Sequence, residues 1–398
     1  MLPQTPMRLD DAVSIPVPLA DRPYEVLVGP RLLVRLGEIL AERMSPRRVF
    51  VVFDEGLPQE MLVDATRALA HHNFVVSSAG VRAVETEKTL DAAGRILEDL
   101  VESRHERNDP VISLGGGVTG DIAGFVAAVY RRGVPVIHCP TTLLSMVDAS
   151  VGGKTGVNLR TESGLRKNMA GAIWQPSLVL ADTRALDTLP DRQLRAGLAE
   201  CVKHGLLSAD AGDPDLLAWT TQHAAGALHR DAATLQELIS RNVRIKAHVV
   251  AQDEREESDG QSNGASSRML LNLGHTFAHA IETMPQLSPD GRPEHTPLQH
   301  GEAVALGLVG ACACGEALGL TDADVLPALL EALRRAGLPT SVRDLPSTER
   351  VVEAMGHDKK VASGKLRVIV PTALGRARVI VDPDRDAVAA GVNAMRAT

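Results

Sequence analysis

Short apolar runs alternate with amphipathic stretches through the first half of the chain. Residues 48–53 form a continuous apolar run that ends at Asp54, which is typical of a strand buried on both faces of a parallel sheet. Similar short runs predict strands at residues 24–28, 74–77, 111–114 and 134–139, and helical spacing predicts helices at 31–43, 59–71 and 89–103. Strands that alternate with helices predict an α/β layer with a mostly parallel sheet.

From about residue 185 the pattern becomes almost entirely helical. Apolar positions at helical spacing predict helices at residues 194–207, 215–225, 234–254, 269–282, 301–318 and 325–336, with a possible hairpin at 366–370 and 377–381. We therefore expect two domains, residues 1–188 and 189–398, with residues 1–22 as an extension. Two polar stretches, 256–267 and 288–297, bracket the helix at 269–282; they could be lids or plain surface insertions.

The helix expected at residues 269–282 carries candidate metal chemistry. His275 and His279 are four residues apart, so a continuous helix would place both imidazoles on one face. Asn272 and Arg268 would extend that polar row toward the start of the helix. A metalloprotease would need Glu at the position that Thr276 occupies, which disfavours that class.

Two residues elsewhere strengthen the metal interpretation. Glu200 lies in a small-residue helical run, and His300 begins another. One carboxylate and two imidazoles are the protein ligands of an open catalytic site for zinc or a related divalent ion. Two half-buried histidines on a packed helix are the alternative for the 269–282 helix taken by itself.

Composition and charge exclude several other classes. The 398 residues are 44% hydrophobic but only 2% aromatic, and the net charge is −8 with no block of Lys or Arg, which disfavours a nucleic-acid partner. The four cysteines form no C-x-x-C pair, and the N-terminus has no apolar signal region. The longest uncharged apolar run, 303–315, is too short to span a bilayer. We expect a cytoplasmic protein without a membrane partner.

A glycine loop is the second candidate site. Residues 115–120 satisfy G-x-G-x-x-G between an expected strand and an expected helix, where backbone N–H groups can approach a pyrophosphate. Asp54, Thr141 and Thr142 follow strands and would lie at the same sheet edge. Residues 151–156 imitate a P-loop, but Asp148 stands where that motif needs Gly, which disfavours an NTPase. A tight strand–helix turn without a ligand is the alternative for the glycine loop.

Six motifs in order resemble the 3-dehydroquinate synthase family. They are SLGGGVTGDIAGFVAA, PTTLLSMVDASVGGKTGVN, KNMAGAIWQP, LPDRQLRAGLAECVKHG, NLGHTFAHAIE and HGEAVALG, and the likeness runs from about Tyr24 to about Val381. The resemblance implies a Rossmann-like NAD-binding α/β domain, a mainly α-helical metal-binding domain, the cofactors NAD and zinc or cobalt, and a homodimer. It also implies a lyase that acts in the shikimate pathway of aromatic amino-acid biosynthesis.

The resemblance also implies roles for individual residues. The metal ligands would be Glu200, His275 and His300, the same three residues that the spacing indicates. The NAD-binding residues would be Asp54, Glu85, Lys88, Gly116, Gly117, Val118, Asp121, Thr141, Thr142, Lys154, Lys167, Leu186 and Thr188. The catalytic and substrate-binding residues would be Arg132, Asp148, Lys154, Asn168, Lys203, Lys246, Arg268, Asn272 and His279, with Lys359 or Lys360.

The implied substrate is 3-deoxy-D-arabino-heptulosonate 7-phosphate. Transient oxidation by NAD, loss of phosphate, re-reduction and an aldol closure would give 3-dehydroquinate with no net redox change. Two other activities stay open at this point. One is a related sugar phosphate cyclase that makes a cyclitol, such as 2-deoxy-scyllo-inosose or an epi-valiolone. The other is a metal-dependent alcohol dehydrogenase, which would release NADH.

Overall fold

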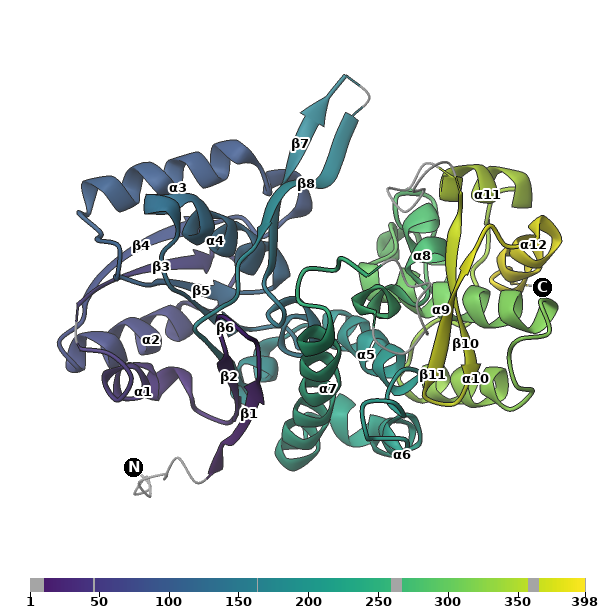
Figure 1. The fold of residues 1–398 in the computed structure, drawn as a ribbon, viewed down its shortest axis with the longest axis horizontal. Coiled ribbons are helices and arrows are strands. Elements are labelled where there is room, and N and C mark those ends of the chain that lie inside the picture. The colour runs from purple at the N-terminus through teal and green to yellow at the C-terminus, as the bar shows by residue number, and fades with distance from the viewer. Residues whose placement is uncertain (1–10, 46, 163, 259–266, 357–364, 398) are drawn as a thin grey trace. The chain divides into compact units, whose positions relative to one another are not determined.

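The computed structural model describes residues 11–45, 47–162, 164–258, 267–356 and 365–397. Contacts divide the chain into two compact units (Figure 1). The first contains residues 1–189 and 235–243, and the second contains residues 190–234 and 244–398. The expected domain boundary at residue 188 stays a prediction. The first unit also includes residues 235–243, which belong to a helix later in the chain.

A seven-stranded sheet forms the centre of the first unit. Its order is β1-β2-β9-β6-β5-β3-β4, and every neighbouring pair is parallel except β1 with β2. The strands are β1 (Val13–Val17), β2 (Tyr24–Gly29), β3 (Arg48–Asp54), β4 (Val75–Val81), β5 (Val111–Gly115), β6 (Val136–Pro140) and β9 (Leu178–Asp182). The expected mostly parallel α/β layer is confirmed.

Helices cover both faces of this sheet (Figure 1). They are α1 (Leu36–Ala41), α2 (Gln59–His71), α3 (Leu90–Glu102) and α4 (Gly117–Val129). Val49 and Val51 of β3 pack in one core cluster with residues of α1 and α2. Phe50 and Val52 point to the other face and pack with residues of α3 and α4. Burial on both faces explains why the strand sequences are continuous apolar runs.

The strand order changes direction between β3 and β5. After β3 the chain forms β4 on one side of β3 and then β5 on the other side. Ligands of open α/β sheets bind at such a point, beyond the carboxyl ends of the strands. Phe53 is aligned with Leu114, and Gly115 with Pro140, so the residues after β3, β5 and β6 share one edge.

Three parts of the first unit differ from the sequence predictions. Residues 13–17 belong to the expected extension but form the edge strand β1, whose Ile15 and Val17 are buried. The segment expected to be a loop near Lys154 begins a hairpin, β7 (Lys154–Thr161) with β8 (Gly164–Ile173), and β9 was not predicted. The hairpin is antiparallel and extends beyond the sheet (Figure 1), so its strands lack the continuous apolar run of buried strands.

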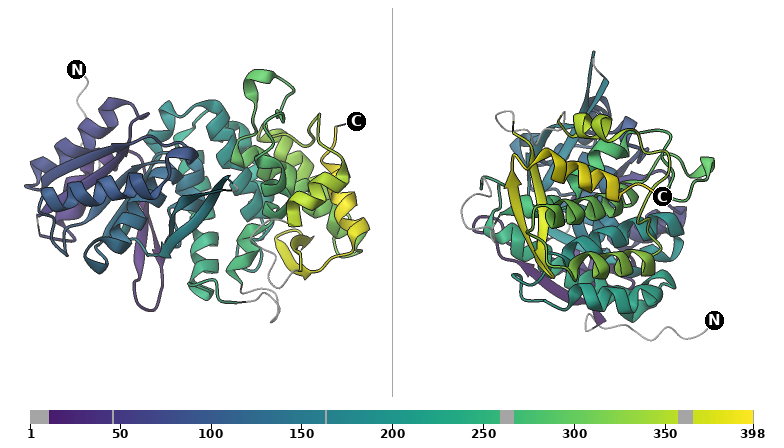
Figure 2. Two further views of the ribbon diagram at one scale, coloured as in Figure 1. Left: turned by 90° about the horizontal axis from the view of Figure 1, so that it is seen from above. Right: turned by 90° about the vertical axis from the view of Figure 1, so that its right-hand side faces the viewer.

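The second unit is mainly helical, as expected. Its helices are α5 (Asp191–Gly205), α6 (Leu216–Leu228), α8 (His275–Glu282), α9 (His300–Ala317), α10 (Val325–Arg335), α11 (Thr348–Gly356) and α12 (Arg385–Ala394), while α7 (Ala232–Gln252) contributes residues to both units. Nearly all of α9 is buried, and it contacts α5, α8, α10 and α12. The expected hairpin is β10 (Arg367–Ala373) with β11 (Arg376–Val381), the yellow pair of strands in the right-hand view of Figure 2. β10 contacts α9.

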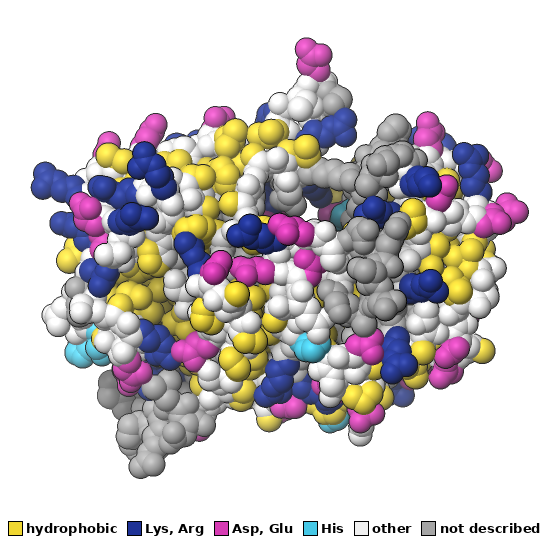
Figure 3. Space-filling view, in the orientation of Figure 1, with side chains coloured by type: hydrophobic (Ala, Val, Ile, Leu, Met, Phe, Trp, Pro, Cys, Tyr) yellow, Lys and Arg dark blue, Asp and Glu magenta, His cyan; other side chains and the backbone are white. Residues whose placement is uncertain are grey.

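The surface carries both signs of charge. On the face drawn in Figure 3, basic and acidic side chains are interspersed. Exposed hydrophobic side chains occur on or near the β7–β8 hairpin, including Met169, Ile173 and Leu90. Among the described residues, no helix combines the length and the apolar character needed to cross a bilayer.

The carboxylate of Asp182 provides a test of how the first unit is held together. It is buried at the end of β9 and accepts hydrogen bonds from the backbone N–H groups of Arg31 (2.8 Å), Leu33 (2.9 Å) and Arg184 (3.0 Å). Asp182→Ala would leave buried donors without an acceptor, so we expect a loss of unfolding free energy of about 2–4 kcal/mol in urea denaturation.

Asp187→Ala is the matched control. Its carboxylate pairs with Arg184 at 2.7 Å, but both side chains are largely exposed, so the unfolding free energy should change by about 0.5 kcal/mol or less. Equal losses in the two variants would contradict the role assigned to Asp182.

Candidate active site

Three helices of the second unit present the candidate metal ligands. Glu200 lies on α5 and is fully buried, His275 is the first residue of α8, and His300 is the first residue of α9. Gly274, directly before His275, has a left-handed conformation with φ of 78°. A Cβ on Gly274 would also come within 2.9 Å of the backbone nitrogen of Leu308. Both the backbone conformation and the close packing therefore require Gly at this position.

The continuous helix expected at residues 269–282 is wrong. A short 3₁₀ helix, Arg268–Asn272, precedes Gly274, and only residues 275–282 are α-helical. The left-handed glycine breaks the helical row, because it turns the chain just before His275. Arg268 and Asn272 therefore do not continue the face that carries His275 and His279.

The three ligand groups converge nonetheless. Nε2 of His300 lies 3.6 Å from Oε1 of Glu200, and Nε2 of His275 lies 3.9 Å from the same oxygen. One ligand atom from each residue falls within 4.8 Å of the others. Donors at about 2.0–2.1 Å around a tetrahedral zinc ion lie about 3.3 Å apart, so these spacings are slightly wider than those of a closed site.

Each imidazole is oriented by its second nitrogen. Nδ1 of His275 lies 3.1 Å from the carbonyl oxygen of Leu273, and Nδ1 of His300 lies 3.2 Å from Oε2 of Glu282. In the tautomer in which Nδ1–H donates to these acceptors, each Nε2 faces Glu200 with its lone pair available to a metal ion, which is the usual arrangement of histidine metal ligands. Glu282 was in a quoted motif but received no predicted role, because its partner His300 lies on another helix.

The charges around Glu200 also suit a cation. Partial burial would lower the pKa of His300, but the carboxylates of Glu200 and Glu282 raise it to about 10. This direction shows that the two carboxylates favour a positive charge at the position of the imidazole. A divalent ion bound at Nε2 would take the place of that proton.

Two further polar side chains lie beside the cluster. Lys203 is 1% exposed and forms an ion pair with Oε2 of Glu200, one turn back on α5. The ring centroid of His279 lies 5.5 Å from that of His275 and 6.5 Å from that of His300. Lys246 on α7 is also buried.

The 3₁₀ segment before α8 supplies two more predicted residues. Arg268 is buried and donates to the carbonyl oxygen of Glu254 at 2.7 Å. Asn272 donates to Oε1 of Glu256 at 3.4 Å. Both residues belong to the second unit, although not to the helix on which they were expected.

The glycine loop of the first unit has the predicted strand–turn–helix form. β5 ends at Gly115 and α4 begins at Gly117, and the first helical bond runs from Gly120 N–H to the Gly116 carbonyl. A Cβ on Gly115 would lie 2.6 Å from Oγ1 of Thr119, and one on Gly116 would lie 3.1 Å from Thr142. The turn thus has no side chains at Gly115 and Gly116, next to the first-turn N–H groups of α4 that can bind a phosphate.

Predicted residues from three segments meet in a second cluster of the first unit. Nζ of Lys88 pairs with the carboxylate of Asp121 on α4 and donates to Oδ1 of Asn168 on β8 at 2.6 Å. Asn158 on β7 connects this group to Glu85: its Nδ2 donates to the carbonyl and to Oε1 of Glu85, each at 2.8 Å, and its Oδ1 accepts from Asn168 N–H at 2.8 Å.

Asn158 is a residue that the sequence predictions missed. It is buried and makes three hydrogen bonds that hold the segments of Glu85 and Asn168 together. The only signal was its position at the end of the quoted motif PTTLLSMVDASVGGKTGVN.

The remaining predicted residues lie at varied depths. Within the first unit, Leu186 is buried, Asp54, Val118 and Asp148 are half-buried, and Arg132, Lys154, Lys167 and Thr188 are exposed. Lys359 and Lys360 lie outside the described residues.

The fold and the site define the class of protein. It is a two-unit chain with a dinucleotide-type glycine turn in an α/β unit and a Glu-His-His cluster in a helical unit. The sequence matches 3-dehydroquinate synthase N-terminal over residues 78–196 and 3-dehydroquinate synthase C-terminal over residues 197–361. The chain belongs to the 3-dehydroquinate synthase family, and it is therefore an enzyme of the phosphate-eliminating lyase type.

Full-length relatives agree with this family. The chain is 43% identical to 3-dehydroquinate synthase from Cereibacter sphaeroides over 379 residues, which cover 94% of this chain and 96% of the relative. It is 40% identical to the enzyme of that name from Nitrobacter hamburgensis over 387 residues, which cover 95% and 94% of the two chains.

Solved structures show the same fold. 2-Epi-5-epi-valiolone synthase from Streptomyces hygroscopicus subsp. jinggangensis, with NAD⁺ and Zn²⁺ bound, superimposes with a TM-score of 0.80 at 26% identity, covering 95% of this chain and 98% of that one. A probable glycerol dehydrogenase from Sinorhizobium meliloti, at a TM-score of 0.61 and 16% identity over 93% and 95% of the two chains, shows likeness of fold alone.

Removal of one imidazole tests the metal site. His275→Ala should abolish retention of zinc or cobalt, because only two of the three converging protein donors would remain. Metal content per chain after dialysis, measured by plasma mass spectrometry, checks this. His279→Ala is the matched control, one turn later on α8, and should retain the ion. Full occupancy in His275→Ala would contradict the assignment.

Removal of the Asn158 amide tests the second cluster. Asn158→Ala deletes three hydrogen bonds and frees the segment of Glu85, so we expect NAD affinity to fall about tenfold in calorimetric titration. Arg160→Ala, on the exposed part of β7, should bind NAD like the unmodified protein. Equal NAD affinity in both variants would show that Asn158 is not needed to hold this site.

Proposed function

We propose that this protein converts 3-deoxy-D-arabino-heptulosonate 7-phosphate to 3-dehydroquinate and inorganic phosphate. The observation that carries the proposal is the buried Glu200–His275–His300 cluster, with Lys203 beside it, in a chain 43% identical to a named 3-dehydroquinate synthase over nearly its whole length. Phosphate is eliminated and a carbocycle is closed, with no net oxidation or reduction.

NAD and one divalent ion, zinc or cobalt, are the cofactors of this proposal. The donor set of Glu200, His275 and His300 fits such an ion, and the bare turn at Gly115–Gly117 fits a pyrophosphate. The related valiolone synthase supports both, since its solved structure holds NAD⁺ and Zn²⁺. When bound, NAD would accept a hydride from the carbon that bears the reacting hydroxyl and later return it, and the ion would polarise that hydroxyl as it loses its proton.

The cationic side chains of the second unit suit an acidic phosphorylated substrate. Lys203, Lys246 and Arg268 are all buried, and buried cations are stable only beside compensating charge or hydrogen-bond acceptors. Lys203 already pairs with Glu200 and Arg268 with the Glu254 carbonyl, and a substrate carboxylate and phosphate would add further acceptors for such donors and fix the orientation of the ring. The carboxylate favours this substrate over the sugar phosphates that cyclitol-forming relatives use.

Two residues of the metal cluster's surroundings are assigned to proton transfer and charge stabilisation. His279 lies one turn beyond His275, close enough to exchange a proton with a hydroxyl held beside the cluster. Lys203 is held by Glu200 and stabilises the negative charge that develops on the hydroxyl oxygen when its carbon is oxidised.

The first unit contributes binding groups in this proposal. Lys88, Asp121 and the glycine turn hold NAD, and Asn168, linked to Lys88, contacts the substrate. Arg132 is exposed, as a residue that reaches a neighbouring subunit's substrate would need to be. A homodimer and a cytoplasmic location belong to the same proposal, and the exposed Met169 and Ile173 on β8 support a protein interface in this unit.

One assay separates the candidate reactions. Metal-loaded enzyme with catalytic NAD and 3-deoxy-D-arabino-heptulosonate 7-phosphate should release phosphate and form 3-dehydroquinate in equal amounts. NADH absorbance should not accumulate, because the hydride returns to the product in each turnover.

Other outcomes would contradict the proposal. Steady accumulation of NADH would indicate a dehydrogenase. Turnover of sedoheptulose 7-phosphate or glucose 6-phosphate, with none of the acid substrate, would indicate a cyclitol-forming enzyme, the class of the valiolone synthase that shares the fold.

A further inference from the structure

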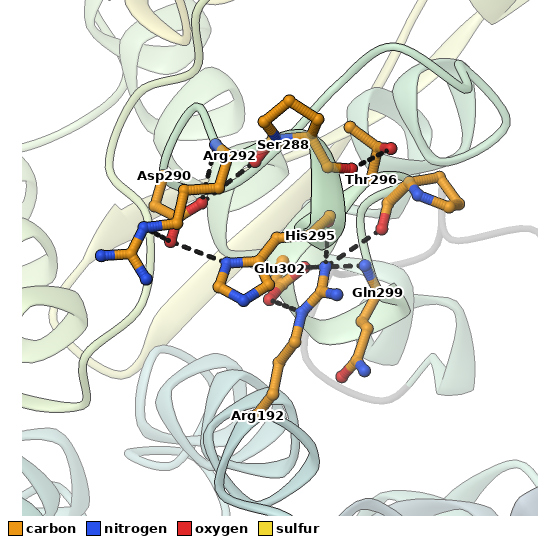
Figure 4. A network of polar contacts seen from close by, with 10 residues as sticks. Arg192, Ser288, Asp290, Arg292, His295, Thr296, Gln299 and Glu302 are labelled. Atoms are coloured by element: carbon orange, nitrogen blue, oxygen red, sulfur yellow. Dashed lines mark hydrogen bonds and ion pairs between the residues drawn. The ribbon is translucent and has the colours of Figure 1, made fainter.

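The helices that carry two of the candidate metal ligands are joined at their first turns by an ion pair. Arg192 is the second residue of α5, and Glu302 is the third residue of α9. Nε of Arg192 lies 2.7 Å from Oε1 of Glu302, and its second guanidinium nitrogen lies 2.7 Å from Oε2 (Figure 4). This bidentate geometry is the strongest and most directional form of an ion pair between side chains.

The same two side chains hold the segment that leads into α9. The guanidinium of Arg192 also donates to the carbonyl oxygens of His295 (2.6 Å) and Pro297 (3.0 Å). Glu302 accepts from Gln299 N–H at 2.8 Å and completes a capping box at the start of α9. Glu302 is largely buried, with 6% of its side chain exposed, and lies where the helix dipole favours a carboxylate.

A second network fixes the same segment farther from the helix. Asp290 accepts from Ser288 Oγ (3.1 Å) and from Arg292 N–H (3.1 Å), and pairs with Nδ1 of His295 at 2.8 Å (Figure 4). Desolvation opposes ionisation of Asp290, but these partners lower its pKa to about 2, so the group is a carboxylate at neutral pH. His295 therefore connects the two networks. Its ring pairs with Asp290, and its carbonyl oxygen accepts from Arg192.

Backbone packing leaves little space between α5 and α9 at this level. A Cβ built on Gly301 would overlap the carbonyl oxygen of Ala196, which lies one turn before Glu200. His300 lies between Glu302, which the ion pair fixes, and Gln299, whose N–H donates to Glu302. Nε2 of His300 lies 3.6 Å from Oε1 of Glu200. The position of the His300 backbone relative to α5 is therefore set on both sides.

We propose that Arg192 is a positioning residue of the metal site, which acts through Glu302 to hold His300 at coordination distance from Glu200. The inference rests on the proposed metal site but adds residues that touch neither the ion nor the substrate. Loss of the ion pair allows the first turn of α9 to shift, and a small displacement of one ligand weakens coordination. Residues that orient metal ligands change metal affinity by about 10- to 100-fold when they are removed.

Metal affinity measured without substrate tests this role. We expect Arg192→Gln to weaken Co²⁺ binding at least about tenfold in competition with a chromophoric chelator, and to change the visible spectrum of bound Co²⁺. Arg192→Lys keeps the charge but loses the planar fork, so it should have an intermediate affinity. Glu302→Gln should weaken binding as Arg192→Gln does, and the double variant should bind no more weakly than the weaker single variant.

Arg230→Gln is the matched control. Arg230 forms an ion pair at 2.7 Å with Asp191, the residue before Arg192 on α5. Unlike Glu302, Asp191 is exposed. This variant should bind Co²⁺ with the affinity and spectrum of the unmodified protein. The inference is overturned if Arg192→Lys and folded Arg192→Gln keep full affinity and an unchanged spectrum, or if Arg230→Gln weakens binding equally. Failure of the unmodified protein to bind Co²⁺ would instead overturn the proposed metal site.

Discussion

The carboxylate of Glu200 is the charge around which the second unit is arranged. It is fully buried, and a buried carboxylate is tolerated only where positive or hydrogen-bonding groups compensate it. Lys203 pairs with one oxygen, and the imidazoles of His275 and His300 face the other. A divalent ion satisfies the same requirement, because it supplies the positive charge at the point where the two Nε2 atoms and the carboxylate oxygen converge.

Close helix packing makes this convergence possible. Gly301 lets the start of α9 lie against the backbone of α5 at Ala196, and Gly307 lets the same helix lie against Gly274, directly before His275. Larger residues at either glycine would separate helices that must bring three side chains to one point. The Ala- and Gly-rich sequence of α9 and the scarcity of aromatic residues thus have a direct consequence for the site.

The sequence alone predicted the features that depend on local pattern. The strand–glycine–helix turn at 115–117 and the α/β layer followed from the continuous apolar runs, and the three candidate ligands followed from residue type and motif order. The helix break at Gly274 was missed because the apolar spacing continues on both sides of it, while only the left-handed backbone shows the turn. The strand β1 was missed because it has only five residues, in which buried and exposed positions alternate, so it has no continuous apolar run. Its pairing with β2 is visible only in the fold.

Residues that act through a distant partner could not be found in this way. Asn158, Glu282 and Arg192 each contact a group at least 18 positions away or on another element, namely Glu85, His300 and Glu302. A single sequence shows their chemical type but not their partner. Their roles became visible only when the fold placed the two halves of each pair at hydrogen-bond distance.

Glu200, His275 and His300 are expected to bind one ion together. The most direct measurement is X-ray absorption at the cobalt edge of the stoichiometrically loaded protein, combined with anomalous scattering from its crystals. We expect a single ion bound by two imidazole nitrogens and one carboxylate oxygen, with donors at about 2.0–2.2 Å. An ion at another position, or a ligand set without the Glu200 carboxylate, would contradict this expectation.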